Sequence, residues 1–217
     1  MLSCPESGLW AVADGMGGHD AGEVASALVV EALRAVCGGT ELSARMLATR
    51  QALQDANRQL QSMAQGGESK RTIGSTVVLM AAQGMSFACL WAGDSRAYRA
   101  RDGVLDRLTR DHSLVQQLVD SGDIDPEFAP NHPNANIILR AVGAAPELEL
   151  DEVQGALQAG DVFLLASDGV TRLVSDGELL AQLGAADLAA AADHLMETCL
   201  ARKAPDNVTF VIVRMQP

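Results

Sequence analysis

The sequence has few basic residues and few aromatic ones. The 217-residue chain has 16 Lys and Arg against 28 Asp and Glu, a formal net charge of −12. A nucleic-acid partner needs a basic protein face, and an anionic membrane surface attracts one, so this balance argues against both. Aromatic residues make up only 3% of the chain, so its core must rest on Leu, Val, Ala and Met.

Other features are absent as well. The four cysteines, Cys4, Cys37, Cys89 and Cys199, include no Cys-x-x-Cys pair, which favours free thiols in a reducing compartment over disulfides or zinc. No apolar run approaches the ~18 residues of a spanning helix, and no basic segment followed by a long apolar one marks a signal peptide. We therefore expect a cytoplasmic protein without a membrane partner.

Hydrophobic residues make up 48% of the chain, enough for one domain over residues 1–217. Apolar runs and turn residues predict strands at 8–13, 72–82, 85–92, 96–101, 104–108, 137–141, 147–154, 161–166 and 208–213. Helical spacing predicts helices at 21–36, 43–64, 113–122, 176–183 and 186–202. Because helices lie on both sides of a central block of hairpins, the order indicates an α+β fold with antiparallel sheets and helices packed outside.

Four aspartates stand at the ends of apolar strands. Asp14 follows Leu-Trp-Ala-Val-Ala, and Asp94 follows Phe-Ala-Cys-Leu-Trp-Ala-Gly. Asp168 follows Val-Phe-Leu-Leu-Ala-Ser, and Asp206 precedes the last strand. Because strand ends lie beside strand starts in antiparallel sheets, the four carboxylates can converge at one edge. There they would repel one another unless cations neutralise them, and oxygen-rich sites suit Mg²⁺ or Mn²⁺.

An alternative reading treats each aspartate as a turn residue. Asp is common where a strand enters a turn, because its side chain accepts hydrogen bonds from nearby backbone N–H groups. On that reading the chain is an inert scaffold. The residue pattern alone therefore supports no more than a candidate divalent-cation site.

Short polar and glycine-rich segments accompany the four aspartates. They are Asp14-Gly15-Met16-Gly17-Gly18-His19 with Ala21-Gly22-Glu23-Val24-Ala25-Ser26, Gly74-Ser75-Thr76, Gly93-Asp94-Ser95-Arg96-Ala97-Tyr98 with Leu108-Thr109-Arg110-Asp111-His112-Ser113, Ala166-Ser167-Asp168-Gly169-Val170, and Asp206-Asn207-Val208-Thr209. Together and in this order, they resemble the motifs of bacterial PP2C-like (PPM) protein serine/threonine phosphatases. The resemblance covers nearly the whole chain.

The resemblance implies a fold and a metal site. The fold is a sandwich of two packed antiparallel β-sheets with a helix layer on each side, and the site holds two or three Mn²⁺ or Mg²⁺ ions. By motif, Asp14 would bridge two ions and Gly15 would offer its backbone carbonyl. Asp168 and Asp206 would hold one ion of the pair. Asp94, with Asp168, would hold a third metal.

The resemblance also implies a reaction. Asp14 and Asp168 would be catalytic through metal-bound water, because a hydroxide bridging two cations would attack the phosphorus of phosphoserine or phosphothreonine in a protein. The partners would be phosphorylated proteins, with a Ser/Thr kinase working in opposition, and we expect a monomer. Residues 113–139 resemble the family's flap, which helps choose substrates. We expect His112 to be exposed near a helix start rather than to act as an acid.

Two features depart from the family pattern. Relatives usually begin further upstream, with an arginine that grips phosphate and a further metal-binding aspartate, and neither has a counterpart here. The flap often carries basic residues after His-Pro, where this chain has Asn134-Ala135-Asn136. Either the start of the chain is assigned too late and the full protein is an ordinary enzyme, which we favour, or the chain is a catalytically weak regulatory module that binds phosphoprotein or metal.

Overall fold

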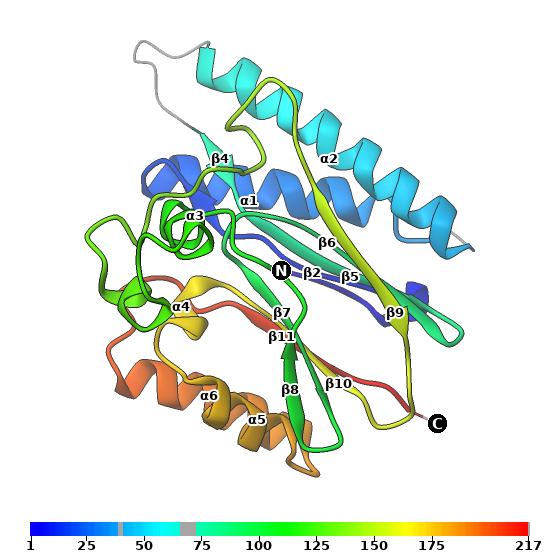
Figure 1. Cartoon of the computed structure of the whole chain (residues 1–217). Helices are drawn as coiled ribbons and strands as arrows, with labels where there is room; N and C mark the ends of the chain where they lie inside the picture. Colours follow the sequence, from blue (N-terminus) through cyan, green and yellow to red (C-terminus); the bar gives the residue numbers. More distant parts are fainter. Residues whose placement is uncertain (39–40, 66–72, 217) are drawn as a thin grey trace.

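Two antiparallel sheets form the centre of the molecule in the computed structural model, which describes residues 1–38, 41–65 and 73–216 (Figure 1). Within these residues the first sheet has the order β1-β2-β5-β6-β9. Its strands are β1 (Leu2–Cys4), β2 (Leu9–Val12), β5 (Val77–Gln83), β6 (Ser86–Ala92) and β9 (Asp151–Ala156). All of its neighbouring strands pair antiparallel.

The second sheet has the order β11-β10-β7-β8 among the described residues, again antiparallel. Its strands are β7 (Arg96–Arg101), β8 (Val104–Arg107), β10 (Val162–Ala166) and β11 (Phe210–Arg214). A small ladder joins β3 (Gly15–Met16) to β4 (Gly74–Ser75). The chain passes from the first sheet to the second between β6 and β7, so residues 93–95 lie at the junction of the two sheets.

Helices cover the outer face of each sheet. α1 (His19–Arg34) and α2 (Leu42–Gln65) lie on the first sheet, and α5 (Asp176–Leu183) and α6 (Leu188–Ala201) lie on the second (Figure 1). The shorter helices are α3 (Leu114–Ser121), α4 (Asp168–Thr171), η1 (Pro5–Ser7) and η2 (Pro126–Asn131).

Three apolar layers hold these elements together, and strand alternation explains them. In β5, Leu79 points to the layer under α1 and α2, whereas Met80 points to the layer between the sheets. In β10, Phe163 faces the layer between the sheets and Leu164 faces α5 and α6. Because successive side chains point to opposite faces, a strand buried on both faces must be apolar throughout. This arrangement confirms the predicted sandwich of two sheets between helix layers.

Most predicted elements are present, with three corrections. The strand predicted at 72–82 is divided at Thr76, because Gly74–Ser75 pairs with β3 whereas Val77–Gln83 belongs to the first sheet. The predicted strand at 137–141 is wrong: Ile138 forms only an isolated bridge to Ser113, in a loop beside α3. The strand predicted at 147–154 begins only at Asp151. The last two errors come from apolar residues that pack from irregular backbone, as Leu148 does against the first core layer. Residue 72, predicted to begin a strand, lies outside the described residues.

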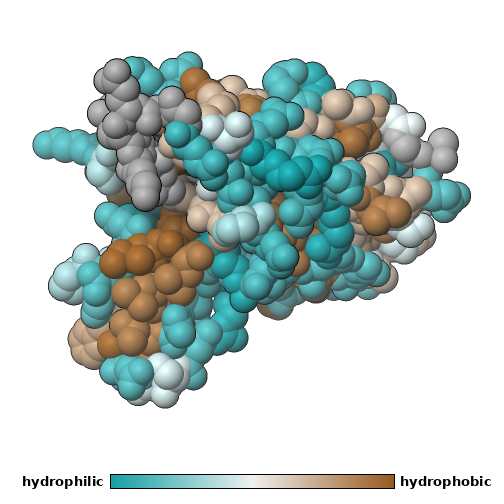
Figure 2. All heavy atoms as spheres, turned by 90° about the horizontal axis from the view of Figure 1, so that it is seen from above, coloured by the Kyte–Doolittle hydropathy of each residue, from teal (hydrophilic) through white to brown (hydrophobic). Residues whose placement is uncertain are grey.

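The face seen in Figure 2 is largely hydrophilic, with its largest group of hydrophobic residues at the lower left and smaller groups elsewhere. This agrees with the acidic charge balance of the chain. Over the described ranges, the helices are too short or too polar for any of them to cross a bilayer.

Candidate metal and phosphate site

The four predicted aspartates come from both sheets and lie around one end of the sandwich. Asp14 follows β2 of the first sheet, and Asp94 lies in the crossing from β6 to β7. Asp168 follows β10 and is the first residue of α4. Asp206 is exposed, in the segment that leads into β11. No helix was predicted at Asp168, which begins α4.

The carboxyl groups interact with one another. Burial raises the pKa of Asp14 to about 7, with further contributions from the charges of Asp168, Asp206 and Asp94 and from a hydrogen bond between the Asp14 and Asp168 carboxyls. Burial also raises the pKa of Asp94 to about 7, helped by Asp168 and Asp111 and opposed by Arg172. The structure thus brings all four predicted aspartates into one electrostatic neighbourhood.

The backbone of Asp14 is fixed by Ser75 at the end of β4 and by Thr76, which follows it. Asp14 N donates to Thr76 Oγ1 at 3.2 Å, and Thr76 N donates to Asp14 O at 2.8 Å. Ser75 Oγ also donates to Asp14 O, at 3.1 Å. Thr76 Oγ1 lies 2.8 Å from Ser95 Oγ, next to Asp94. The Gly-Ser-Thr segment therefore ties Asp14 to the loop that carries Asp94.

Close backbone approaches require glycine beside two of the aspartates. A Cβ on Gly15 would lie 1.7 Å from the backbone oxygen of Gly22 in α1. A Cβ on Gly169 would lie 2.2 Å from the backbone oxygen of Asn207. The second contact presses the start of α4 against the segment that carries Asp206. Ser167 strengthens it, since its Oγ donates to Asn207 O at 3.3 Å and accepts from Thr209 N at 3.2 Å.

One carboxylate oxygen at this site has no donor. Asp168 Oδ1 is buried and receives no hydrogen bond from the described part of the chain. A buried oxygen without a donor is costly unless a cation or water satisfies it. Across residues 1–38, 41–65 and 73–216, no three His, Cys, Asp or Glu side chains are gathered tightly enough to enclose an ion alone.

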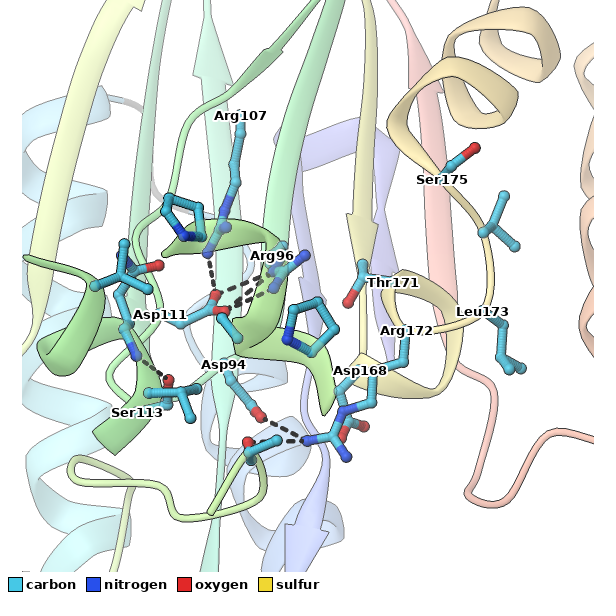
Figure 3. A pocket seen from close by; sticks show the side chains of 18 of the residues that line it. Asp94, Arg96, Arg107, Asp111, Ser113, Asp168, Thr171, Arg172, Leu173 and Ser175 are labelled. Atoms are coloured by element: carbon cyan, nitrogen blue, oxygen red, sulfur yellow. Dashed lines mark hydrogen bonds and ion pairs between the residues drawn. The ribbon is translucent and has the colours of Figure 1, made fainter. Parts of the chain in front are cut away.

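A cavity of about 510 Å³ opens beside Asp94 and Asp168 (Figure 3). Its floor is polar: Arg96 Nε donates to Asp111 Oδ1 and Arg96 Nη2 donates to Asp111 Oδ2, and Asp111 also binds Arg107. Apolar side chains from α3, η2 and the end of α4 line other parts of its wall, among them Val115, Val119, Pro130 and Leu173.

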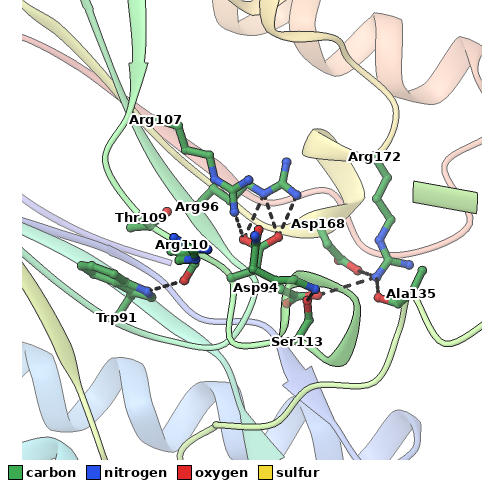
Figure 4. A network of polar contacts seen from close by, with 12 residues as sticks. Trp91, Asp94, Arg96, Arg107, Thr109, Arg110, Ser113, Ala135, Asp168 and Arg172 are labelled. Atoms are coloured by element: carbon green, nitrogen blue, oxygen red, sulfur yellow. Dashed lines mark hydrogen bonds and ion pairs between the residues drawn. The ribbon is translucent and has the colours of Figure 1, made fainter. Parts of the chain in front are cut away.

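Sequence reasoning missed Arg172, which contacts the carboxylates of both Asp94 and Asp168 (Figure 4). Its Nη2 is 3.0 Å from Asp168 Oδ2 and 3.6 Å from Asp94 Oδ2. A spacing of four residues from Asp168 is the usual signal for a helical ion pair. That signal was missed, because no helix was predicted over residues 168–172.

The prediction that His112 is exposed is wrong. Its side chain is 8% exposed, its ring stacks on Trp91, and its Nε2 lies 3.2 Å from Asp151 Oδ2. Its Nδ1 accepts a hydrogen bond from Gly93 N at 3.3 Å. His112 therefore helps fix the loop that carries Asp94. The error arose because a helix-start position was read as solvent-exposed, whereas His112, which precedes the N-cap of α3, packs on Trp91 of β6.

Comparison with known proteins gives one consistent result. Residues 4–204 match the family described as protein phosphatase 2C. The serine/threonine protein phosphatase PstP of Mycobacterium tuberculosis is 39% identical over 207 residues, 94% of this chain. The chain spans only 40% of the length of that relative.

Solved structures agree with the sequence matches. PppA, a key regulatory component of T6SS in Pseudomonas aeruginosa, is 44% identical with a TM-score of 0.90, over 98% of this chain and 88% of that one. The catalytic domain of PstP in complex with 2 manganese ions is 37% identical with a TM-score of 0.84, over 96% of this chain and 88% of that one.

Proposed function

Because the chain belongs to the protein phosphatase 2C family, we propose that it hydrolyses phosphoserine and phosphothreonine in proteins, with Mn²⁺ or Mg²⁺ as its cofactor. The observation that carries this proposal is the common neighbourhood of four strand-end aspartates, two with a pKa raised to about 7. The PstP catalytic domain, which binds manganese, supports the choice of metal.

We assign the metal ligands to the predicted residues. Asp14 would bind both of two metal ions, and Gly15 would offer its backbone carbonyl. Asp168 and Asp206 would hold one ion of this metal pair. The residues fit such ions, because the buried oxygen of Asp168 lacks a donor, and burial followed by repulsion from neighbouring carboxylates raises the pKa of Asp14. Asp94 adjoins Asp168 as a further candidate ligand.

When bound, the cations lower the pKa of a water molecule and offset the charge of the phosphoryl oxygens. The residues of this chain supply the placement. Hydrogen bonds from Ser75 and Thr76 fix the main chain of Asp14, and Gly169 sets α4 against the Asp206 segment. Ligands that are held in place keep the reacting groups aligned, and this alignment accelerates the reaction.

We propose that residues 113–139 form the flap that selects substrates. α3 and η2 from this segment contribute Val115, Gln116, Pro126 and Pro130 to the cavity beside the carboxylates. A phosphoprotein segment would lie in this cavity with its phosphate toward Asp94 and Asp168. We also propose that the protein acts in the cytoplasm as a monomer and opposes a Ser/Thr kinase. The free cysteines are consistent with a reducing compartment.

The test is phosphate release from a phosphothreonine peptide with Mn²⁺. We expect Asp14→Asn and Asp168→Asn each to lower kcat at least 100-fold, roughly the loss of a major transition-state interaction, while Asp193→Asn on the exposed face of α6 leaves it unchanged. Activity that persists in both site variants contradicts the proposal. Mn²⁺ binding without phosphate release, in this chain and in an N-terminally extended one, favours the alternative of a regulatory binding module.

A further inference from the structure

Arg172 contacts both carboxylates that the family pattern would give to a third metal ion. Its Nη2 lies 3.0 Å from Asp168 Oδ2 and 3.6 Å from Asp94 Oδ2 (Figure 4). Asp94 is buried, with a side chain 9% exposed, and Arg172 is 35% exposed. A guanidinium that is partly shielded from water interacts with such carboxylates more strongly than a surface arginine does.

The position of Arg172 is fixed from its other side as well. Its Nη1 donates to Asn136 Oδ1, and its Nη2 lies 3.5 Å from the backbone oxygen of Ala135. Both partners belong to the loop that follows η2. Arg172 therefore joins α4, the crossing loop of Asp94 and the flap, so moving it away from the carboxylates would break contacts on three segments.

Arg172 offsets part of the negative charge at this point. Asp94 and Asp168 provide two carboxylates, and the positive charge of Arg172 opposes the rise in the Asp94 pKa. A divalent ion coordinated by the same Oδ2 atoms would compete with the guanidinium for both of them. Like charges brought this close in a partly buried site repel strongly.

We propose that Arg172 serves as the resident cation of the Asp94–Asp168 pair and takes the place of a third metal ion, so that this chain works with two ions. The inference rests on the proposed function, because it assumes that Asp14, Asp168 and Asp206 bind a pair of metal ions. It also gives Arg172 a positioning role, since the guanidinium ties the flap to the edge of the metal site.

The test is the number of Mn²⁺ ions bound per chain, measured by calorimetry and by electron paramagnetic resonance of the free ion. We expect two bound Mn²⁺ ions for the wild type and three for Arg172→Gln. The affinity of Arg172→Gln for the third ion should be at least tenfold higher than that of the wild type. Arg172→Met, a second neutral variant of similar length, should also bind three. Arg172→Lys keeps the charge and should bind two.

Matched controls identify the site of the third ion. Arg140 is 40% exposed and pairs with Glu149 and Asp151 elsewhere, so Arg140→Gln should bind two ions. The double variant Arg172→Gln/Asp94→Asn should return to two ions, because one ligand of the new site is lost. A wild type that binds three ions overturns the inference.

Two further outcomes separate this inference from the function on which it rests. Two ions in the wild type and still two in both neutral variants overturn the inference alone. No Mn²⁺ bound by the wild type, with Asp14→Asn indistinguishable from it, overturns the proposed metal site and this inference with it.

Discussion

At the scale of single residues, the candidate site is a set of carboxylates whose charges cost free energy in the folded chain. Asp14 and Asp94 each have a pKa raised to about 7, chiefly by burial and then by neighbouring carboxylates. Both values lie above the ordinary value of 3.8. Between about pH 4 and pH 7, the folded chain therefore holds more protons on these groups than the unfolded chain does.

This difference predicts a pH dependence of stability in the absence of divalent ions. With a chelator present, the free energy of unfolding should fall as the pH rises from about 4 to about 7, because the folded state must release protons that the unfolded state has already lost. Thermal melts at pH 5 and pH 7.5 should differ by roughly 5 °C or more.

The matched variants are Asp14→Asn and Asp193→Asn. The first removes one titrating carboxyl and should flatten the decline, while the second, on the exposed face of α6, should keep it. An identical decline in wild type and Asp14→Asn would contradict the assignment.

At the scale of elements, the site depends on how closely backbone segments approach one another. Gly169 in α4 lies against the backbone of Asn207, and Ser167 binds the same segment through its hydroxyl. These contacts hold Asp168 and Asp206 together although they are far apart in sequence. The packing of α4 is therefore a requirement of the site and not only of the core.

Two glycine substitutions separate packing from helix propensity. Gly169→Ala should lower stability by about 1–3 kcal/mol, because its Cβ would lie 2.2 Å from Asn207 O and force the segments apart. Gly177→Ala in α5 meets no atom within 4 Å and should raise stability by about 0.5 kcal/mol. Urea unfolding measures both values, and equal effects of the two changes would contradict the close approach.

At the scale of the whole molecule, part of the negative charge of the chain is concentrated at one end of the sandwich. The net charge is −12, and four of the aspartates gather where the two sheets meet. Ligands that bind only the folded state stabilise it in proportion to the logarithm of their concentration. Divalent ions should therefore act on global stability as well as on activity.

Mn²⁺ at about 100 times its dissociation constant should stabilise the fold by roughly 2.7 kcal/mol for one ion, which raises Tm by about 5–10 °C. The rise should be at least halved in Asp14→Asn and retained in Asp193→Asn. Scanning calorimetry at several Mn²⁺ concentrations measures it. A Tm that is independent of Mn²⁺ would contradict specific binding.

The sequence alone determined the layered fold and the four aspartates. Apolar strands with turn residues between them predicted the hairpins β5–β6 and β7–β8, because strand alternation and turn chemistry are local properties. The motifs placed Asp14, Asp94, Asp168 and Asp206 as one set. The predicted metal roles of these residues stay predictions.

Only the tertiary structure decided which other groups face those carboxylates. The spacing of Arg172 from Asp168 is informative only once residues 168–172 are known to be helical, and its contacts with Asp94 and Ala135 join segments far apart in sequence. The burial of His112 against Trp91 and the loop at 137–141 likewise follow from packing between elements. Local propensity carries no information about such contacts, since they form when separate strands and helices fill the same space.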